Sequence, residues 1–196
     1  MKRLSLGSVA VIAALALFAS PAEAQTPLHL IAGPTFGTIS TDDFDGAGTS
    51  VGFFAGIGTS VMLTETVALS PYLVYAQKGT EFDDGEKDSY DYIELPLLLG
   101  VQVPVGESVG LNLFAGPQIG LQINCDEDGF DCSDFSNHKS TEFGVVGGAS
   151  VAFPTGGGAV SVGGGVDIGL TDLFDELDYK TRTFFLSLQY TTYVGG

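Results

Sequence analysis

The sequence predicts an all-β protein: an eight-stranded, antiparallel, up-and-down β-barrel that crosses a membrane. Three observations carry this prediction. Segments of roughly 11 to 15 residues alternate apolar and polar side chains, which is the length a tilted membrane strand needs. The connections between these segments are alternately short and long. Asp and Glu concentrate in the long connections, so the segments themselves are nearly free of charge, as hydrocarbon-crossing strands should be.

The clearest pair of segments lies between Tyr72 and Val105, where two strands flank an acidic stretch. In the second strand Ile93, Leu95, Leu97, Leu99, Val101 and Val103 occupy every other position, and Tyr92, Glu94, Pro96, Leu98, Gly100 and Gln102 lie between them. One face is therefore apolar and the other mixed. This hairpin alone fits a soluble sheet as well as a membrane barrel, so the rest of the chain has to decide.

The first 24 residues are expected to be a secretory signal peptide rather than part of the barrel. A basic start at Lys2 and Arg3 is followed by an apolar run from Val9 to Ala19 and by the A-x-A site at residues 22–24. The apolar run is too short for a spanning helix. We expect cleavage after Ala24, which leaves residues 25–196 as the barrel domain.

Eight strands are predicted in that domain. They cover residues 28–39, 51–63, 67–79, 90–103, 109–123, 140–153, 159–170 and 181–194. The short connections are residues 64–66, 104–108 and 154–158, and the long ones are residues 40–50, 80–89, 124–139 and 171–180. Strict alternation of this kind is typical of an up-and-down barrel with one tight rim, and an even strand number places both termini at that rim.

The acidic residues mark the long connections and their flanks. They are Asp42, Asp43, Asp45, Glu81, Asp83, Asp84, Glu86, Asp88, Asp91, Asp126, Glu127, Asp128, Asp131, Asp134, Glu142, Asp172, Asp175, Glu176 and Asp178. The densest clusters, Asp83 with Asp84 and Asp126 with Asp128, are weak candidates for binding a divalent cation, although neither has the spacing of an EF-hand. The alternative is a solvated anionic rim. A formal net charge of −17 disfavours nucleic acid as a partner.

Alternation also predicts which side chains face inward. In the fifth strand Val109, Leu111, Leu113, Ala115, Pro117, Ile119 and Leu121 are expected to face lipid. Glu94, Gln118, Gln122 and Asp167 are expected in the interior, and the parity of the third strand allows Lys78 there. An eight-stranded barrel is just wide enough for side chains to fill it, and buried charges need partners. The sequence therefore predicts a plugged barrel with interior ion pairs, or alternatively a constriction that selects small solutes.

Two cysteines, Cys125 and Cys132, lie in the third long connection. Export to an oxidising compartment makes a local disulfide the expected state. A closed zinc site is the weaker alternative, because these thiols and the nearby His138 fall short of four ligands.

We find no catalytic residues and expect no cofactor. His29 and His138 have no suitably spaced Ser and acid beside them, and the glycine runs lack the strand–turn–helix setting of a dinucleotide site.

Several stretches resemble one family. The YAQKG run at residues 75–79, the YIELPLL run at residues 92–98 and the FAGPQIGL run at residues 114–121 are similar to the outer-membrane β-barrel domain of porin and PorT-like small barrels of Bacteroidetes and related Gram-negative bacteria. The resemblance covers essentially the whole predicted mature chain. It implies location in the outer membrane, contact with outer-membrane lipid and lipopolysaccharide, and insertion by the barrel assembly machinery.

The expected function is therefore that of a monomeric, non-enzymatic outer-membrane barrel with acidic extracellular loops. Its role would be envelope structure, adhesion or limited solute passage, with divalent cations as further partners of the loops. The alternative is a secreted or periplasmic soluble lipid-binding β-barrel that keeps its apolar residues inside. A lipid-modifying barrel enzyme is a third, weaker alternative.

Overall fold

The computed structural model describes residues 25–40, 48–81, 87–105, 109–127, 130–131, 140–171 and 180–195. Its strands are β1 (Thr26–Ser40), β2 (Ser50–Thr59), β3 (Val61–Met62), β4 (Val67–Glu81), β5 (Lys87–Pro104), β6 (Gly110–Glu127), β7 (Phe130–Asp131), β8 (Thr141–Thr155), β9 (Gly158–Gly169) and β10 (Lys180–Val194). Within these ranges, eight strands are long, while β3 and β7 are two-residue pairings onto β4 and β6. The predicted fold class is confirmed.

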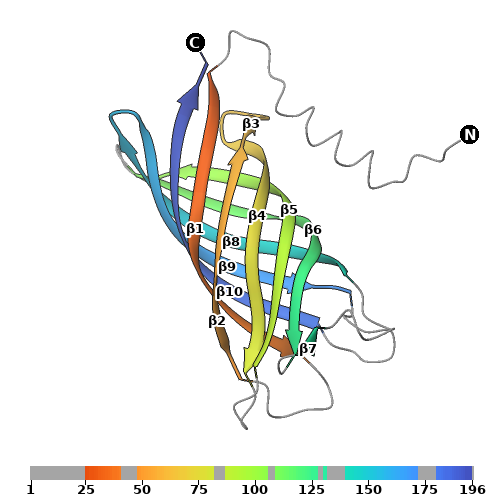
Figure 1. Cartoon of the computed structure of the whole chain (residues 1–196). Helices are drawn as coiled ribbons and strands as arrows, with labels where there is room; N and C mark the ends of the chain where they lie inside the picture. The colour runs from red at the N-terminus through yellow and green to blue at the C-terminus, as the bar shows by residue number, and fades with distance from the viewer. Residues whose placement is uncertain are drawn as a thin grey trace, which may run out of the picture.

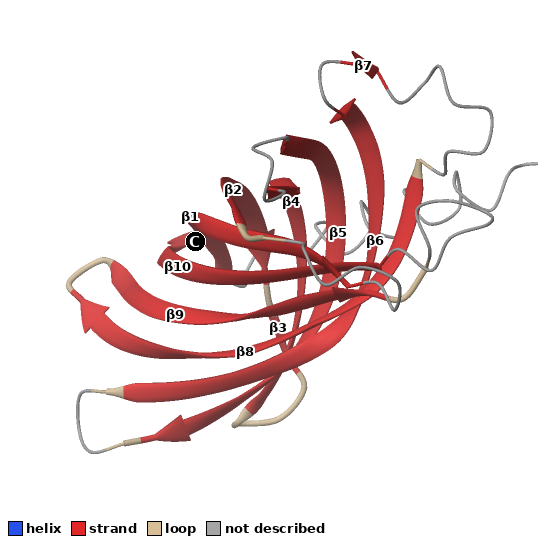
Figure 2. Cartoon of the chain, turned by 90° about the horizontal axis from the view of Figure 1, so that it is seen from below, coloured by secondary structure: helices blue, strands red, loops and turns tan. Residues whose placement is uncertain are grey.

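All pairings are antiparallel and the sheet closes on itself, as Figure 2 shows from below. The order runs β2-β1-β10-β9-β8-β6-β5-β4, and a further ladder between β2 and β4 completes the ring. Long strands that follow one another in the sequence thus pair throughout, and the first and last strands meet, with Thr26 opposite Val194. Closure leaves no row of unpaired backbone groups along the barrel wall, which lipid would penalise heavily.

The two rims differ as predicted. The start of β1 and the end of β10 lie together at one rim, with the turns at residues 63–66 and 156–157 (top of Figure 1). The long connections leave from the opposite rim. One predicted strand is interrupted: residues 51–63 divide into β2 and the short β3, with Ser60 between them.

The outer surface of the wall is apolar. Leu97 and Leu99 of β5 are 38% and 47% exposed, while Glu94 of the same strand is 5% exposed. The pattern repeats on β10, where Phe184, Leu186 and Leu188 are exposed and Ser187 is buried. Because apolar and polar residues alternate along each strand, the outer face of the barrel is apolar and the interior is largely polar, as a barrel surrounded by lipid requires. Among the described residues, no helix is long and apolar enough to cross a membrane.

Candidate functional site: the barrel interior

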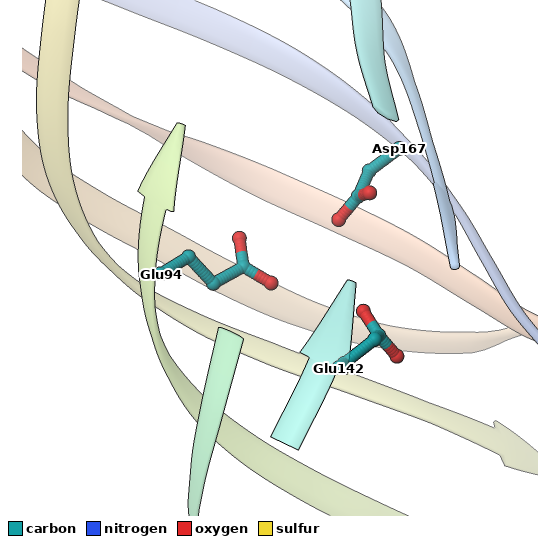
Figure 3. A group of neighbouring side chains, drawn as sticks. All are labelled: Glu94, Glu142 and Asp167. Atoms are coloured by element: carbon teal, nitrogen blue, oxygen red, sulfur yellow. The ribbon is translucent and has the colours of Figure 1, made fainter. Parts of the chain in front are cut away.

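A buried lysine lies at the centre of the interior site. Lys78 of β4 points inward and is 5% exposed. Its Nζ lies 2.7 Å from Glu94 Oε1 of β5, 2.7 Å from Glu142 Oε1 of β8 and 2.6 Å from Asp167 Oδ2 of β9. Figure 3 shows the three carboxylates turned toward one another across the lumen. We call these four residues the lysine cluster; it links strands from several parts of the ring.

Neutral side chains donate hydrogen bonds to two carboxylates of the lysine cluster. Thr181 Oγ1 donates to Glu142 Oε2 at 2.7 Å, and Gln118 Nε2 donates to Asp167 Oδ1 at 2.5 Å. Charged groups removed from water need such partners, because an uncompensated buried charge is costly. Gly169 leaves room for this packing, since a Cβ there would lie 2.6 Å from Thr181 Oγ1.

Aromatic residues close the lumen on the long-loop side of the lysine cluster. Tyr92 is fully buried, Tyr90 is 1% exposed, and Thr80 of β4 is fully buried beside them. Lys78 Nζ lies 5.0 Å from the centre of the Tyr92 ring, within range of a cation–π contact. Ions, hydroxyls and rings thus fill this half of the barrel, and we refer to it as the closed half.

The other half of the interior is hollow. A cavity of about 1000 Å³ extends from the short-turn rim to the lysine cluster. Phe54, Val74 and Ala76 form a buried apolar wall, with Ile31 and Phe185 packed against it. The predicted filling of the interior by side chains does not extend to this hollow half, where small residues such as Ala68, Ser70 and Gly100 line the lumen. The plugging of the barrel as a whole stays a prediction.

Polar side chains gather at the mouth of the cavity around His29. Its Nδ1 lies 2.9 Å from Thr191 Oγ1 and its Nε2 lies 3.1 Å from Ser60 Oγ. Tyr72 stacks on the imidazole at 5.8 Å between ring centres and donates a hydrogen bond to Gln189 Oε1 at 3.1 Å. We call these residues the mouth network. The Ser60–His29 contact could not be read from the sequence, because His29 lies on β1 and Ser60 lies between β2 and β3, 31 residues farther along the chain. A catalytic triad would need an acidic side chain at Nδ1, on the side of the imidazole away from Ser60. Nδ1 of His29 instead lies against the uncharged hydroxyl of Thr191, which cannot act as that acid.

The structure places the four residues that the sequence predicted in the interior as follows. Glu94 and Asp167 belong to the lysine cluster, and Gln118 donates a hydrogen bond to Asp167. Gln122 is half-buried farther along β6. Glu142, counted with the acidic flank of the third long connection, is the second residue of β8, and its side chain is 1% exposed inside the barrel, which its place in the sequence did not indicate. Val109 and Leu111, expected to face lipid, line the cavity near its mouth.

Other expected sites fall beyond what the structure describes. Asp83, Asp84 and Asp128 lie outside the described residues, as do His138 and the side chain of Asp126. Cys125, at the long-loop end of β6, is buried and is not a free thiol. Its expected partner Cys132 lies outside the described residues, so the disulfide stays a prediction.

Comparison with known proteins identifies the class. Residues 9–191 match the family described as the outer membrane protein beta-barrel domain. The chain therefore belongs to this family, as its sequence motifs predicted, and its location is the cell outer membrane. No curated protein matches it.

Solved structures are similar to this chain at low sequence identity, and that of the neisserial surface protein NspA shares its fold. The neisserial surface protein NspA is 12% identical, with a TM-score of 0.54 over 83% of this chain and 96% of that one. Ail, the attachment invasion locus protein of Yersinia pestis, is 14% identical, with a TM-score of 0.48 over 86% and 99%. The outer membrane enzyme PagL is 15% identical, with a TM-score of 0.47 over 83% and 97%.

The family and the apolar outer face together decide between the two classes of barrel. A soluble lipid-binding barrel would turn its apolar residues inward, whereas residues such as Leu97, Leu186 and Leu188 are exposed on the outside. The soluble alternative is therefore wrong.

Proposed function

We propose that this protein is a non-enzymatic, non-conducting outer-membrane barrel that holds four acidic loops at the cell surface. The observation that supports this best is the closed half. Lys78 and three carboxylates cross the lumen from different strands, and buried tyrosines lie on their long-loop side. A solute entering through the hollow half would meet this layer before reaching the long-loop rim. The barrel is then a scaffold for its loops rather than a route for solutes.

The orientation follows from the asymmetry of the rims. Bacterial barrels keep short turns in the periplasm and longer loops outside. Both described ends of the chain lie at the short-turn rim, so all four long connections emerge together on the other side. These connections and their flanks carry most of the Asp and Glu residues of the chain. We infer that divalent cations bind there and bridge the loops to lipopolysaccharide phosphates, which gives the protein a role in envelope structure or adhesion.

A planar bilayer measurement tests the closed lumen. The wild-type protein should show no stable, large conductance. As a matched comparison, the variant Lys78→Ala/Glu94→Ala/Glu142→Ala/Asp167→Ala removes the bulk and charge of the lysine cluster and should conduct small ions. Large, weakly selective channels in the wild type would overturn the proposal.

Treatment of intact cells with a loop-directed protease tests the orientation. Cleavage in the long connections from outside is expected. Cleavage only after the periplasm is opened would reverse the assignment.

A chelator such as EDTA should weaken retention of lipopolysaccharide on the purified protein. Equal retention with and without chelator would show that cations do not bridge the two.

Limited solute passage is a second candidate, and the hollow half favours it, because half the lumen is already open. It requires the lysine cluster to separate. A wild-type conductance that is small but reproducible, and that changes with Lys78→Met, would support this candidate over the first.

A further inference from the structure

The cavity in the hollow half has a mouth and a blind end. Along β4 the inward residues run from Ala68 near the mouth to Lys78 at the blind end, and all of them line the cavity. Ten residue positions separate these two, or roughly 33 Å measured along a tilted strand. The space is therefore long and narrow, which suits an extended chain better than a compact ligand.

The middle of the cavity is apolar. Phe54, Val74 and Ala76 are less than one-tenth exposed and form one wall, and Phe114, Val146 and Phe185 line other parts of the same space. Apolar walls around a space of this volume favour an apolar ligand, because burying its surface removes it from water.

The blind end has the opposite character and carries an excess of hydrogen-bond acceptors. Three carboxylates meet one ammonium there, so negative groups outnumber positive ones. Gln118 and Thr183, 4% and 3% exposed, both line the cavity at this level. Gln118 Oε1 and Thr183 Oγ1 have no hydrogen-bond partner among the described residues. Because the Gln118 amide nitrogen already donates to Asp167, its oxygen is left as an acceptor.

These two features select one chemical class. We propose that the hollow half is a binding site for a single-chain primary alkylammonium amphiphile, which enters from the short-turn rim with its amine first. The ammonium donates its N–H bonds to Gln118 Oε1, to Thr183 Oγ1 and to the carboxylate of Glu94, and the Asp167 carboxylate beside them adds electrostatic attraction. The alkyl chain lies against Phe54, Val74 and Phe185. A carboxylate of the same chain length would meet like charges at the blind end and is excluded by repulsion. This inference is independent of the role of the loops.

The absence of tryptophan from the chain provides the test. The variant Phe54→Trp places a single reporter on the cavity wall, and Phe53→Trp, at a side chain that is 50% exposed on the lipid side, is its matched control. Both would be folded in phosphatidylcholine nanodiscs. The probe is 4-bromoundecylammonium, because bromine quenches tryptophan on contact and Phe54 pairs with Ala76, two residues from Lys78 at the blind end; 4-bromoundecanoate is the anionic comparison. Folding of every variant is checked by circular dichroism.

The ammonium probe should quench the Phe54→Trp protein saturably, with one probe per barrel. The carboxylate probe should bind at least about tenfold more weakly, as expected for the loss of a charge-assisted hydrogen bond. Adding Glu94→Gln or Asp167→Asn should weaken ammonium binding by a similar factor. Glu65→Gln, at the mouth and far from the blind end, should leave it unchanged.

Three results would overturn the proposal. Equal quenching in the Phe54→Trp and Phe53→Trp proteins would mean that the probe only partitions into lipid. Equal affinity for both probes would mean that the blind end does not select charge. Unchanged affinity in folded Glu94→Gln and Asp167→Asn proteins would mean that the amine does not reach the lysine cluster.

Discussion

The closed and hollow halves are built from the same strands, yet their interiors differ. On β4, Ala68, Ser70 and Tyr72 line the hollow half, while Lys78 and Thr80 belong to the closed half. Strand number fixes the circumference and would leave a space that side chains just fill. The comparison shows that filling depends on more than circumference. Long charged and aromatic side chains converge at one level, and small or short ones face each other at the other.

The largest test of this difference is Lys78→Ala. Removing one partner of a buried ion cluster leaves uncompensated charge, so we expect the free energy of unfolding to fall by about 3–5 kcal/mol. Urea unfolding in lipid vesicles measures it. The matched control is Lys78→Met combined with Glu94→Gln, Glu142→Gln and Asp167→Asn, which removes all four charges and should cost much less. If Lys78→Ala is as stable as wild type, the lysine cluster does not stabilise the closed half.

The second test moves to the outer surface and asks how the free energy of folding in lipid depends on the height of a charge along the barrel wall. Leu97→Arg places a charge on the lipid face near the middle of β5, and folding in lipid should be disfavoured by ~2–4 kcal/mol. Ile123→Arg, toward the long-loop rim, should cost ~0–1 kcal/mol by the same depth rule. Both are measured by reversible folding into vesicles. Equal effects at the two positions would show that the membrane lies at a different level.

Reduction of the expected Cys125–Cys132 disulfide tests what stabilises the rim next to the closed half. A ring this short constrains the unfolded chain by on the order of 2–3 kcal/mol. Because the ring lies at the end of β6, reduction should loosen the loop without unfolding the barrel. Thiol titration of protein isolated without reductant should find no free cysteine, and limited proteolysis should become faster after reduction. Two reactive thiols before reduction would contradict the prediction.

The smallest expected effects come from adding one leucine to the hollow half or to the closed half, which compares the packing of the two halves directly. Ser70→Leu adds volume in the hollow half and should change the free energy of unfolding by less than ~1 kcal/mol, because space is present. Thr181→Leu adds volume in the closed half and removes the hydrogen bond to Glu142, so it should cost about 1–3 kcal/mol. Thermal unfolding of the two variants gives the comparison. Equal destabilisation would mean that both halves are equally packed.

Much of the fold was predictable because strand periodicity and loop composition are local signals. Alternation from Ile93 to Val103 placed β5 and its two faces correctly, and the alternation of short and long connections gave the closed ring. The acidic signal grouped Glu142 with the flank of a long connection and did not indicate that it faces the interior. It follows a long acidic connection by sequence, but β8 has already begun at Thr141, and the side chain turns inward.

The site itself was less predictable, because it depends on how the strands are staggered around the ring. Glu94 and Asp167 could be assigned to the interior because they alternate with lipid-facing residues along their strands. That they meet on Lys78 depends on the register between β4 and β5 and on the stagger accumulated across β6, β8 and β9. The Ser60–His29 contact and the cavity have the same origin. Neither parity nor composition specifies height along the barrel axis.

The pairing of β1 with β10 has a consequence for how the barrel forms. Thr26 and Val194 stand at opposite ends of the described sequence, so this ladder closes a loop that contains nearly the whole domain. Contacts between such distant residues slow folding, because most of the loop-closure entropy is lost before they form. Until then β1 and β10 each present a strand edge with unpaired amides, the feature that makes partly folded sheets prone to aggregate. The ring can close only after β10 has been exported, so the chain is most prone to aggregate in the time between export and closure.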